Sequence, residues 1–210
     1  MKAKNKSPLF YWLGGSTCAG KTTISNALSV KYGVTVYHCD EYLVKHIEKS
    51  NAQKHPNLNK IAKTSWNDIL SMNVEEYIKW TTGSFREEFD MILEDLYQLP
   101  DDKPILVEGI NLLPKLINEE IANNINHAVW LVADEPFYIK HQMNRKELFE
   151  RVNECSNQEQ ALQNYMSNDL AFGKYILNET KKLGLNVIKT DNESDIKKNI
   201  ELISRHFGLI

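Results

Sequence analysis

Residues 15–22 read Gly15-Ser16-Thr17-Cys18-Ala19-Gly20-Lys21-Thr22 and match the pattern G-x-x-x-x-G-K-(S/T). The glycines let the backbone bend so that successive N–H groups face one concavity and bind phosphate oxygens. In such a loop the lysine reaches the β- and γ-phosphates of a nucleotide, and the hydroxyl that follows it binds Mg²⁺. The alternative is a glycine-rich turn that matches by accident. The context disfavours that alternative, because an apolar run precedes the loop and a helical pattern follows it.

Short apolar runs alternate with longer stretches of helical period along the rest of the chain. Strands are expected at residues 9–13, 34–38, 104–107, 128–132 and 185–189. Helices are expected at 21–32, over most of 40–104, from 156 to Gly184 and at 196–207. The pairs Ser84/Glu87 and Ser156/Glu159 fit capping boxes and predict helix starts at these two points. This alternation predicts an α/β fold with a parallel sheet covered on both faces.

Composition limits the class of protein. The chain has 210 residues, of which 42% are hydrophobic and 25% charged, and a formal net charge of −3. A chain without excess positive charge lacks the field of a duplex-DNA binder, and no apolar run reaches the length of a signal peptide or membrane span. Its three cysteines, without a C-x-x-C pair, are typical of reduced thiols. We expect one cytoplasmic domain, 1–210, with no nucleic-acid or membrane partner.

Two other classes of nucleotide-binding protein have recognisable signatures. A GTPase would carry D-x-x-G and N-K-x-D, and the sequence has neither. Residues 131–136, Leu-Val-Ala-Asp-Glu-Pro, look like a segment of the transport ATPases. Those proteins also carry an L-S-G-G-Q-type signature, which is absent here, so this reading stays a lesser alternative.

Three features, in order along the chain, resemble the small P-loop kinases. They are the loop ending in G-K-T-T, a short second strand followed by His38-Cys39-Asp40, and an apolar strand ending in Glu108-Gly109. That group includes nucleoside and nucleotide monophosphate kinases, shikimate-type kinases and uridine-kinase-like proteins, bacterial ones among them. The resemblance implies a three-layer fold whose five-stranded parallel sheet has the order 2-3-1-4-5. It also implies transfer of the γ-phosphate of Mg-ATP to a hydroxyl or phosphate of a small molecule.

The resemblance also implies roles for individual residues. Asp40 would contact the acceptor or act as its base, Glu108 would join Thr22 near Mg²⁺, and Lys21 would be an exposed catalytic lysine. The stretch 135–157 would be a lid that moves as one helical unit and carries Arg145 and Arg151, with Arg145 as the catalytic arginine. The nucleotide-binding residues would be Gly15, Ser16, Thr17, Cys18, Ala19, Gly20, Lys21, Thr22 and Thr23.

The helical region 44–100 would form the acceptor side of the site. Arg86 in this region could grip an anionic substrate, and Tyr42 and Asn111 flank the expected acceptor position. After Glu108-Gly109 the sequence lacks the Gly-x-Pro-Arg run with which monophosphate kinases hold their acceptor. This absence argues against a nucleotide acceptor and leaves the acceptor unidentified.

Each candidate also has a purely structural interpretation. Asp40 could cap a helix, and the arginines could form surface ion pairs. Glu108 ends an apolar run, where a lone carboxylate is costly without a partner such as Mg²⁺, its waters or Lys21.

A second hypothesis is an ATP-binding regulatory or toxin-like protein without a metabolic acceptor. A deep polar pocket beside Asp40 would favour the kinase, and a flat apolar surface on residues 84–99 would favour the regulator. Either protein could be a monomer or a homodimer.

Overall fold

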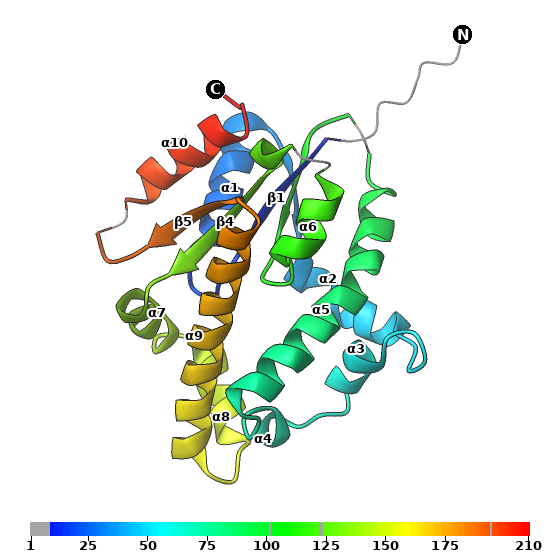
Figure 1. The fold of residues 1–210 in the computed structure, drawn as a ribbon, viewed down its shortest axis with the longest axis vertical. Coiled ribbons are helices and arrows are strands. Elements are labelled where there is room, and N and C mark those ends of the chain that lie inside the picture. The colour runs from blue at the N-terminus through cyan, green and yellow to red at the C-terminus, as the bar shows by residue number, and fades with distance from the viewer. Residues whose placement is uncertain (1–8, 101, 122–123, 194) are drawn as a thin grey trace.

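A computed structural model describes residues 9–100, 102–121, 124–193 and 195–210 (Figure 1). The basic N-terminal residues 1–8, on which part of the signal-peptide expectation rests, lie outside these ranges. The five strands are β1 (Phe10–Gly15), β2 (Thr35–His38), β3 (Ile105–Glu108), β4 (Ala128–Ala133) and β5 (Asn186–Thr190). All five lie where the apolar runs predict them, with ends that differ by one or two residues.

Helices make up most of the remaining chain. They are α1 (Lys21–Tyr32), α2 (Cys39–Lys49), α3 (Pro56–Ile61), α4 (Trp66–Ile69), α5 (Val74–Leu96), α6 (Pro114–Glu120), η1 (Ile125–His127), α7 (Glu135–Gln142), α8 (Lys146–Asn153), α9 (Gln158–Lys182) and α10 (Ile196–His206). None of the helices in the described ranges combines the length and the apolarity that a membrane span requires.

The strands form one parallel sheet in the order β2-β3-β1-β4-β5, which confirms the expected topology. Its register brings three strand ends to one level, because Leu13 of β1 and His38 of β2 both lie opposite Glu108 of β3. On the other side of β1, Gly15 lies opposite Leu131 of β4. The sequence features of the resemblance therefore meet at the carboxyl edge of the sheet.

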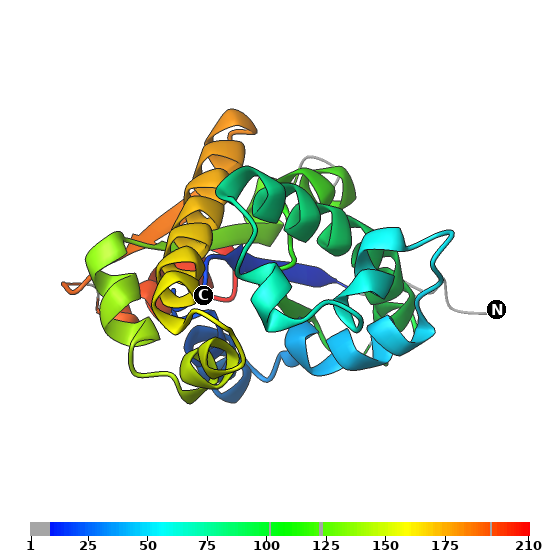
Figure 2. The same cartoon turned by 90° about the horizontal axis from the view of Figure 1, so that it is seen from below.

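Both faces of the sheet are covered, as the resemblance implies. Figure 2 shows α5, α6 and α9 on one side of the sheet and α1 and α10 on the other. Neighbouring residues of β1 point to opposite faces. Trp12 packs with Phe89 and Phe172 of the first layer, and Leu13 packs with Ile24 of α1. The central strand is thus buried on both faces, and its carboxyl end is fixed.

Helix α1 follows the phosphate loop and ends as predicted. Its C-terminal cap is Gly33, at φ 69°, and the N–H of Gly33 donates to the carbonyl oxygen of Ser29 at 2.8 Å. The left-handed conformation suits glycine because a side chain would be strained there. Glycine therefore ends the helix and turns the chain into β2.

The N-cap of helix α5 lies eleven residues before the predicted one. The predicted capping box at Ser84 and Glu87 is wrong, because Ser84 lies inside the helix and its hydroxyl donates to the carbonyl oxygen of Trp80 at 3.0 Å. The actual cap is Asn73, whose side chain accepts from the N–H of Glu76 at 3.0 Å. The Glu76 carboxylate in turn accepts from the N–H of Asn73 at 3.2 Å. The earlier start makes α5 a 23-residue wall for the site.

Glu87 caps a different helix. Its carboxylate accepts from the N–H groups of Asn57 at 2.9 Å and Leu58 at 2.8 Å, at the start of α3. A negative charge is favourable at a helix N-terminus, where N–H groups lack partners within the helix. Glu87 thereby ties α3 to the outer side of α5.

The N-terminus of α9 also differs from the prediction. Its cap is Asn157, whose side chain accepts from the N–H of Gln160 at 3.1 Å, so the predicted pair Ser156 and Glu159 is wrong by one position. Ser156 instead donates its N–H to the side chain of Asn67 at 3.0 Å. This contact brings the start of α9 next to α4.

The expected lid, 135–157, consists of two helices. Helices α7 and α8 are separated by residues 143–145. The prediction that the stretch moves as one helical unit stays a prediction. Leu148 and Val152 of α8 are buried in a small cluster with Ile69 of α4 and Tyr165 of α9. Figure 1 shows α8 beside α4 at the lower end of α9. The second half of this stretch therefore joins the nucleotide side of the protein to the acceptor side.

Candidate functional site

The phosphate loop follows β1 with a backbone that few residues can adopt. Gly15 has φ 133°, and a Cβ there would collide with the carbonyl oxygen of Leu131 on β4. Cys18 and Gly20 also have positive φ values, 60° and 86°. The loop ends at the N-terminus of α1, where free N–H groups and the helix dipole favour an anion. This backbone geometry fits the phosphate-binding loop that the sequence motif predicts.

Side chains around the loop bring cation, hydroxyl and carboxylate together. The Lys21 ammonium donates to the carbonyl oxygen of Ser16 at 2.8 Å and is only 9% exposed, so the expectation of an exposed lysine is wrong. Burial lowers the pKa of Lys21, while the carboxylates of Glu108 and Asp40 act in the opposite direction. The Thr22 hydroxyl donates to Glu108 Oε2 at 3.2 Å. The expected pair Thr22 and Glu108 is therefore in contact.

Glu108 has a further partner that the sequence did not reveal. His38 Nδ1 lies 2.9 Å from the same oxygen, Oε2, that accepts from Thr22. His38 stands at the end of β2, directly opposite Glu108 in the sheet register. The carboxylate is 5% exposed, and these two contacts supply the partners that a buried carboxylate requires.

One cavity of about 820 Å³ joins the phosphate loop to the helical region. Residues 17–23 line one end, and Asp40, Glu108 and Asn111 line its floor at the strand ends. Helix α5 supplies the far wall with residues spaced at three and four positions: Tyr77, Trp80, Thr81, Ser84, Phe85 and Glu88. A nucleotide and a small acceptor would share this single space.

Two of the four predicted acceptor residues line this cavity. Asp40 is exposed in the first turn of α2, whose N-terminus has no side-chain cap, so the capping interpretation does not hold. Asn111 is 3% exposed. Tyr42 is not among the lining residues, because its ring stacks on Tyr37 with centroids 4.3 Å apart. Arg86 is also outside the cavity and lies near Tyr175 of α9. Burial raises the pKa of Tyr175, and the charge of Arg86 acts in the opposite direction.

The two predicted lid arginines line the cavity but differ in their surroundings. Arg145 lies over the phosphate loop, where its Nη1 is 4.0 Å from Cys18 Sγ. Arg151 lies deeper, with its guanidinium 4.4 Å from the ring centre of Trp66 and donating to the Tyr165 hydroxyl at 2.7 Å. The exposed Arg145 is thus the one beside the expected phosphate position.

A buried carboxylate–histidine chain was missed by the sequence analysis. Glu88 is 1% exposed, and its Oε1 lies 3.0 Å from His46 Nδ1. His46 Nε2 lies 3.2 Å from Asp95 Oδ2, which also accepts from Lys45 at 3.2 Å. Asn111 Nδ2 donates to Glu88 Oε2 at 2.9 Å. The chain runs from the cavity wall, through a buried ring, to the protein surface.

The sequence did carry a signal for Glu88. It lies three residues after Phe85 and four before Ile92, and therefore on the apolar face of its helix. A carboxylate on a buried face requires a partner. Within the local sequence the available cation is Arg86, two residues before Glu88, and this spacing favoured a surface ion pair between them. The partner, His46, is 42 residues away on another helix and has no local signature.

Asp169 of α9 was also missed and borders the loop. Its carboxylate accepts from the Tyr138 hydroxyl at 3.0 Å and from the side chain of Thr17. Burial raises the pKa of Asp169, although these hydrogen bonds and the charges of Arg145 and Arg151 act in the opposite direction. The loop thus has a buried acid on the side away from Glu108.

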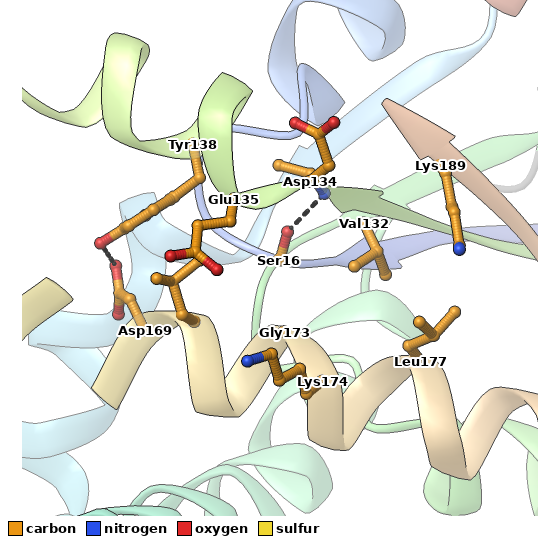
Figure 3. Close-up of a pocket in the computed structure, with 12 residues that line it drawn as sticks. Ser16, Val132, Asp134, Glu135, Tyr138, Asp169, Gly173, Lys174, Leu177 and Lys189 are labelled. Carbon is orange, nitrogen blue, oxygen red and sulfur yellow. Dashed lines mark hydrogen bonds between the residues drawn. The ribbon is translucent and has the colours of Figure 1, made fainter. Parts of the chain in front are cut away.

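Asp169 also lines a second cavity, of about 160 Å³, between β4, α7 and α9 (Figure 3). At its inner end the Ser16 hydroxyl accepts from the N–H of Ala133 at 2.9 Å. Figure 3 shows this contact and the Tyr138–Asp169 hydrogen bond on two sides of the space. The first contact attaches the phosphate loop to β4, and the second attaches α7 to α9. The other cavity, of about 820 Å³, is the one with more room for a ligand.

The donor set at the loop fits Mg²⁺. Mg²⁺ prefers oxygen ligands, and nucleotide enzymes usually hold it with one or two protein oxygens together with phosphates and waters. Thr22 and Glu108 offer a hydroxyl and a carboxylate side by side. Within the described ranges no cluster of three or more histidine, cysteine or acidic residues suits a metal ion. A magnesium ion shared with phosphates therefore fits better than a closed protein site.

Comparison with known proteins supports the architecture. No protein-family model matches the sequence, and no curated protein sequence matches it either. Among solved structures, the protein TT1252 from Thermus thermophilus is similar, with a TM-score of 0.52 and 16% identity, covering 95% of this chain and 98% of that one.

Two kinases of known type are also similar. Deoxyadenosine kinase from M. mycoides, solved with dCMP and dCDP, has a TM-score of 0.49 and 15% identity over 96% of this chain and 100% of that one. A gluconokinase from Sinorhizobium meliloti has a TM-score of 0.47 and 11% identity over 98% and 94%. At these identities the likeness concerns the fold alone. The strand order β2-β3-β1-β4-β5 is the one that the resemblance to small P-loop kinases implies.

Proposed function

We propose that this chain, which has the fold of the small P-loop kinases, transfers the γ-phosphate of Mg-ATP to a hydroxyl of a small molecule. The observation that carries the proposal is the single cavity of about 820 Å³. It is lined at one end by a phosphate-binding loop and beside it by Asp40 and Glu108, and it continues along α5. Phosphoryl transfer depends mainly on positioning and charge stabilisation, which this arrangement supplies.

The nucleotide end would bind and neutralise the phosphates. The N–H groups of the loop and the Lys21 ammonium would hold the β- and γ-phosphates, and Arg145 would approach the transferred group from above Cys18. Thr22 and Glu108 would hold Mg²⁺, which supplies positive charge to the phosphate oxygens when bound. This division of roles follows the contacts of Lys21 and Thr22 around the loop.

Asp40 would act on the acceptor. Its carboxylate is exposed to the cavity and near enough to Lys21 to affect the pKa of that ammonium. In the transfer step the acceptor oxygen bonds to the γ-phosphorus, the bond from that phosphorus to the β–γ bridging oxygen breaks, and the hydroxyl proton passes to Asp40. ADP leaves with the bridging oxygen.

The experiment is a γ-phosphate transfer assay with Mg-ATP and a panel of nucleosides, sugars, hydroxy acids and aminoglycosides. We expect transfer to at least one acceptor and its loss in Asp40→Asn. The matched control is Glu41→Gln, which removes the neighbouring exposed carboxylate outside the cavity and should keep full activity. Equal turnover in wild type and Asp40→Asn would contradict the role of Asp40.

The alternative of an ATP-binding regulator without an acceptor predicts a flat apolar surface on residues 84–99. The inner face of α5 instead presents Ser84 and Glu88 to the cavity beside Asp40. A cavity wall that carries these polar groups is not the flat apolar surface that the regulator predicts, so the kinase is the favoured proposal.

A further inference from the structure

The acceptor end of the cavity has an unusual balance of charge. We define the acceptor wall as the cavity-lining residues within 40–88 and 110–111, all of which the structure describes. This wall contains Asp40 and Glu88 and no lysine, arginine or histidine. Three aromatic side chains of α5, Tyr77, Trp80 and Phe85, lie on the same wall. The wall thus offers carboxylates and flat apolar surface.

The arginine that contacts this wall already has partners. Arg151 of α8 packs on Trp66 and donates to the Tyr165 hydroxyl. The remaining cations of the cavity, Lys21 and Arg145, lie at the phosphate loop. An acceptor with a phosphate or carboxylate group would therefore meet Glu88 without a free cation beside it.

The contacts of Glu88 hold its carboxyl group in place at the cavity wall. Both ring nitrogens of the fully buried His46 face carboxyl oxygens, those of Glu88 and Asp95. The buried Glu88 side chain therefore has the hydrogen-bond partner that a polar group at such a position requires.

Glu88 keeps free capacity to accept hydrogen bonds. Its two oxygens offer about four acceptor sites, of which His46 and Asn111 use one each. Asn111 Oδ1 is buried and has no hydrogen-bond partner in the described part of the chain. Two acceptors on neighbouring residues of the same wall are therefore available to a ligand that donates.

We propose that Glu88 and Asn111 Oδ1 form a subsite that accepts hydrogen bonds from an N–H group of the acceptor. The inference rests on the proposed kinase function and narrows its substrate class. The acceptor is a neutral or cationic hydroxyl compound with a flat apolar part that carries an amino group. Anionic hydroxy acids and phosphate esters are excluded by the same wall. Glu88 is in this sense a specificity-determining residue.

The test compares acceptors that differ by one amino group. Transfer from Mg-ATP is measured to adenosine and to purine riboside, which lacks the amino group, and to the anions gluconate, shikimate and AMP. We expect adenosine to be preferred and the anions to be inactive. A hydrogen bond to a charged group corresponds to about a 10- to 100-fold difference in acceptor KM. In Glu88→Gln the preference for adenosine should shrink, with the KM for ATP unchanged.

The matched control is Glu87→Gln, on the neighbouring residue of α5. Glu87 caps α3 and lies outside the cavity. This variant therefore measures what the loss of a carboxylate from α5 does when the cavity wall is unchanged. It should leave both acceptor preference and acceptor KM as in wild type. If Glu88→Gln does not fold, the comparison of adenosine with purine riboside in the wild-type protein still tests the subsite: equal transfer to the two would overturn it.

The outcomes separate the two proposals. Transfer to gluconate, shikimate or AMP that Glu88→Gln leaves unchanged would overturn the subsite and leave the kinase function standing. Binding of Mg-ATP without transfer to adenosine would also count against the subsite. Failure to bind Mg-ATP in a calorimetric titration would instead overturn the proposed function, and the subsite with it.

Discussion

The two ends of the cavity are built in different ways. The phosphate end comes from eight consecutive residues, 15–22, whose glycines hold the backbone in a left-handed conformation or a close approach to β4. The acceptor wall is assembled from residues between 40 and 111 on several helices. Its central contact joins Glu88 to His46, 42 residues apart. Local backbone geometry makes the first end, and long-range packing makes the second.

Because the two ends are built differently, we expect substitutions at each end to affect a different quantity. At the phosphate end the backbone sets the geometry, and the role proposed for the Lys21 side chain is to bind the phosphates. At the acceptor wall the polar side chains also hold helices α2 and α5 together through buried contacts. Substitutions at the first end should therefore change turnover, and substitutions behind the second should change the free energy of unfolding.

The largest expected effect is at Lys21. Lys21→Ala should lower turnover by about 10³-fold, because removal of one positioned charge donor costs up to that factor. The free energy of unfolding at pH 7 should not fall, because burial lowers the pKa of Lys21 and the charged side chain is therefore disfavoured in the folded protein. Steady-state kinetics and urea unfolding check both parts. Lys31→Ala, in the exposed last turn of α1, is the control and should keep turnover.

The second prediction concerns the opposite end. His46→Ala should lower the free energy of unfolding by about 3–5 kcal/mol, because it leaves a buried carboxylate without its partner. Urea unfolding followed by circular dichroism measures the loss. The control is Lys49→Ala, since Lys49 lies 4.0 Å from Asp95 at the surface and such pairs contribute little. An equal loss in both variants would remove the distinction between the two ends.

The third prediction separates the two arginines of 135–157. Arg145→Ala should lower kcat by about 10²-fold with a smaller effect on ATP binding, because Arg145 is exposed beside the loop. Arg151→Ala should mainly destabilise the protein, by about 1–2 kcal/mol, through loss of its Trp66 and Tyr165 contacts. Kinetics and thermal unfolding of both variants check this division.

Amide exchange tests the lid directly. An ATP analogue with Mg²⁺ should slow exchange across 137–152, since closure over the nucleotide would exclude water from the helices that carry Arg145 and Arg151. Exchange that ignores the nucleotide, together with full activity of Arg145→Ala, would leave no support for a lid.

The sequence predicted what depends on local pattern. The five strands, helix α1 and its end at Gly33 follow from hydrophobic alternation and glycine conformation, and they agree with the structure. The strand order came from the resemblance and is confirmed. Sequence motifs also brought Thr22 and Glu108 to the same edge, because the carboxyl ends of neighbouring parallel strands meet there.

The sequence did not predict the features that depend on contacts between residues far apart in the chain. Ser84 and Glu87 fit a capping box, yet Asn73 begins the helix earlier and Glu87 caps α3 from outside. Arg86 and Tyr42 were assigned to the acceptor site by their position in the chain. The helix rotation places Arg86 near α9, and ring stacking holds Tyr42 on Tyr37. Such placements depend on tertiary packing that no local window contains.

The smallest expected effect is the pH dependence that Asp169 adds to stability. Burial raises the pKa of Asp169 above its ordinary value of 3.8, so the folded protein binds this proton more tightly than the unfolded chain does. The contribution to stability is complete below pH 3.8 and is lost as the pH rises through the raised pKa. In Asp169→Asn this loss should vanish, while the new side chain can still accept from Tyr138.

The measurement is the free energy of unfolding in urea at intervals between pH 3.5 and 7.5, for wild type and Asp169→Asn. The difference between the two proteins cancels the other carboxylates and should shift in favour of the variant as the pH rises. Asp90→Asn, at an exposed position of α5, is the control and should keep the pH profile of wild type. A difference that moves in favour of wild type with rising pH would show that hydrogen bonds from Tyr138 and Thr17, and the arginines nearby, outweigh burial at Asp169. In that case side-chain partners would decide the state of the acid beside the phosphate loop, as they hold Glu88 at the acceptor wall, and the contrast between the two ends of the cavity would be weaker.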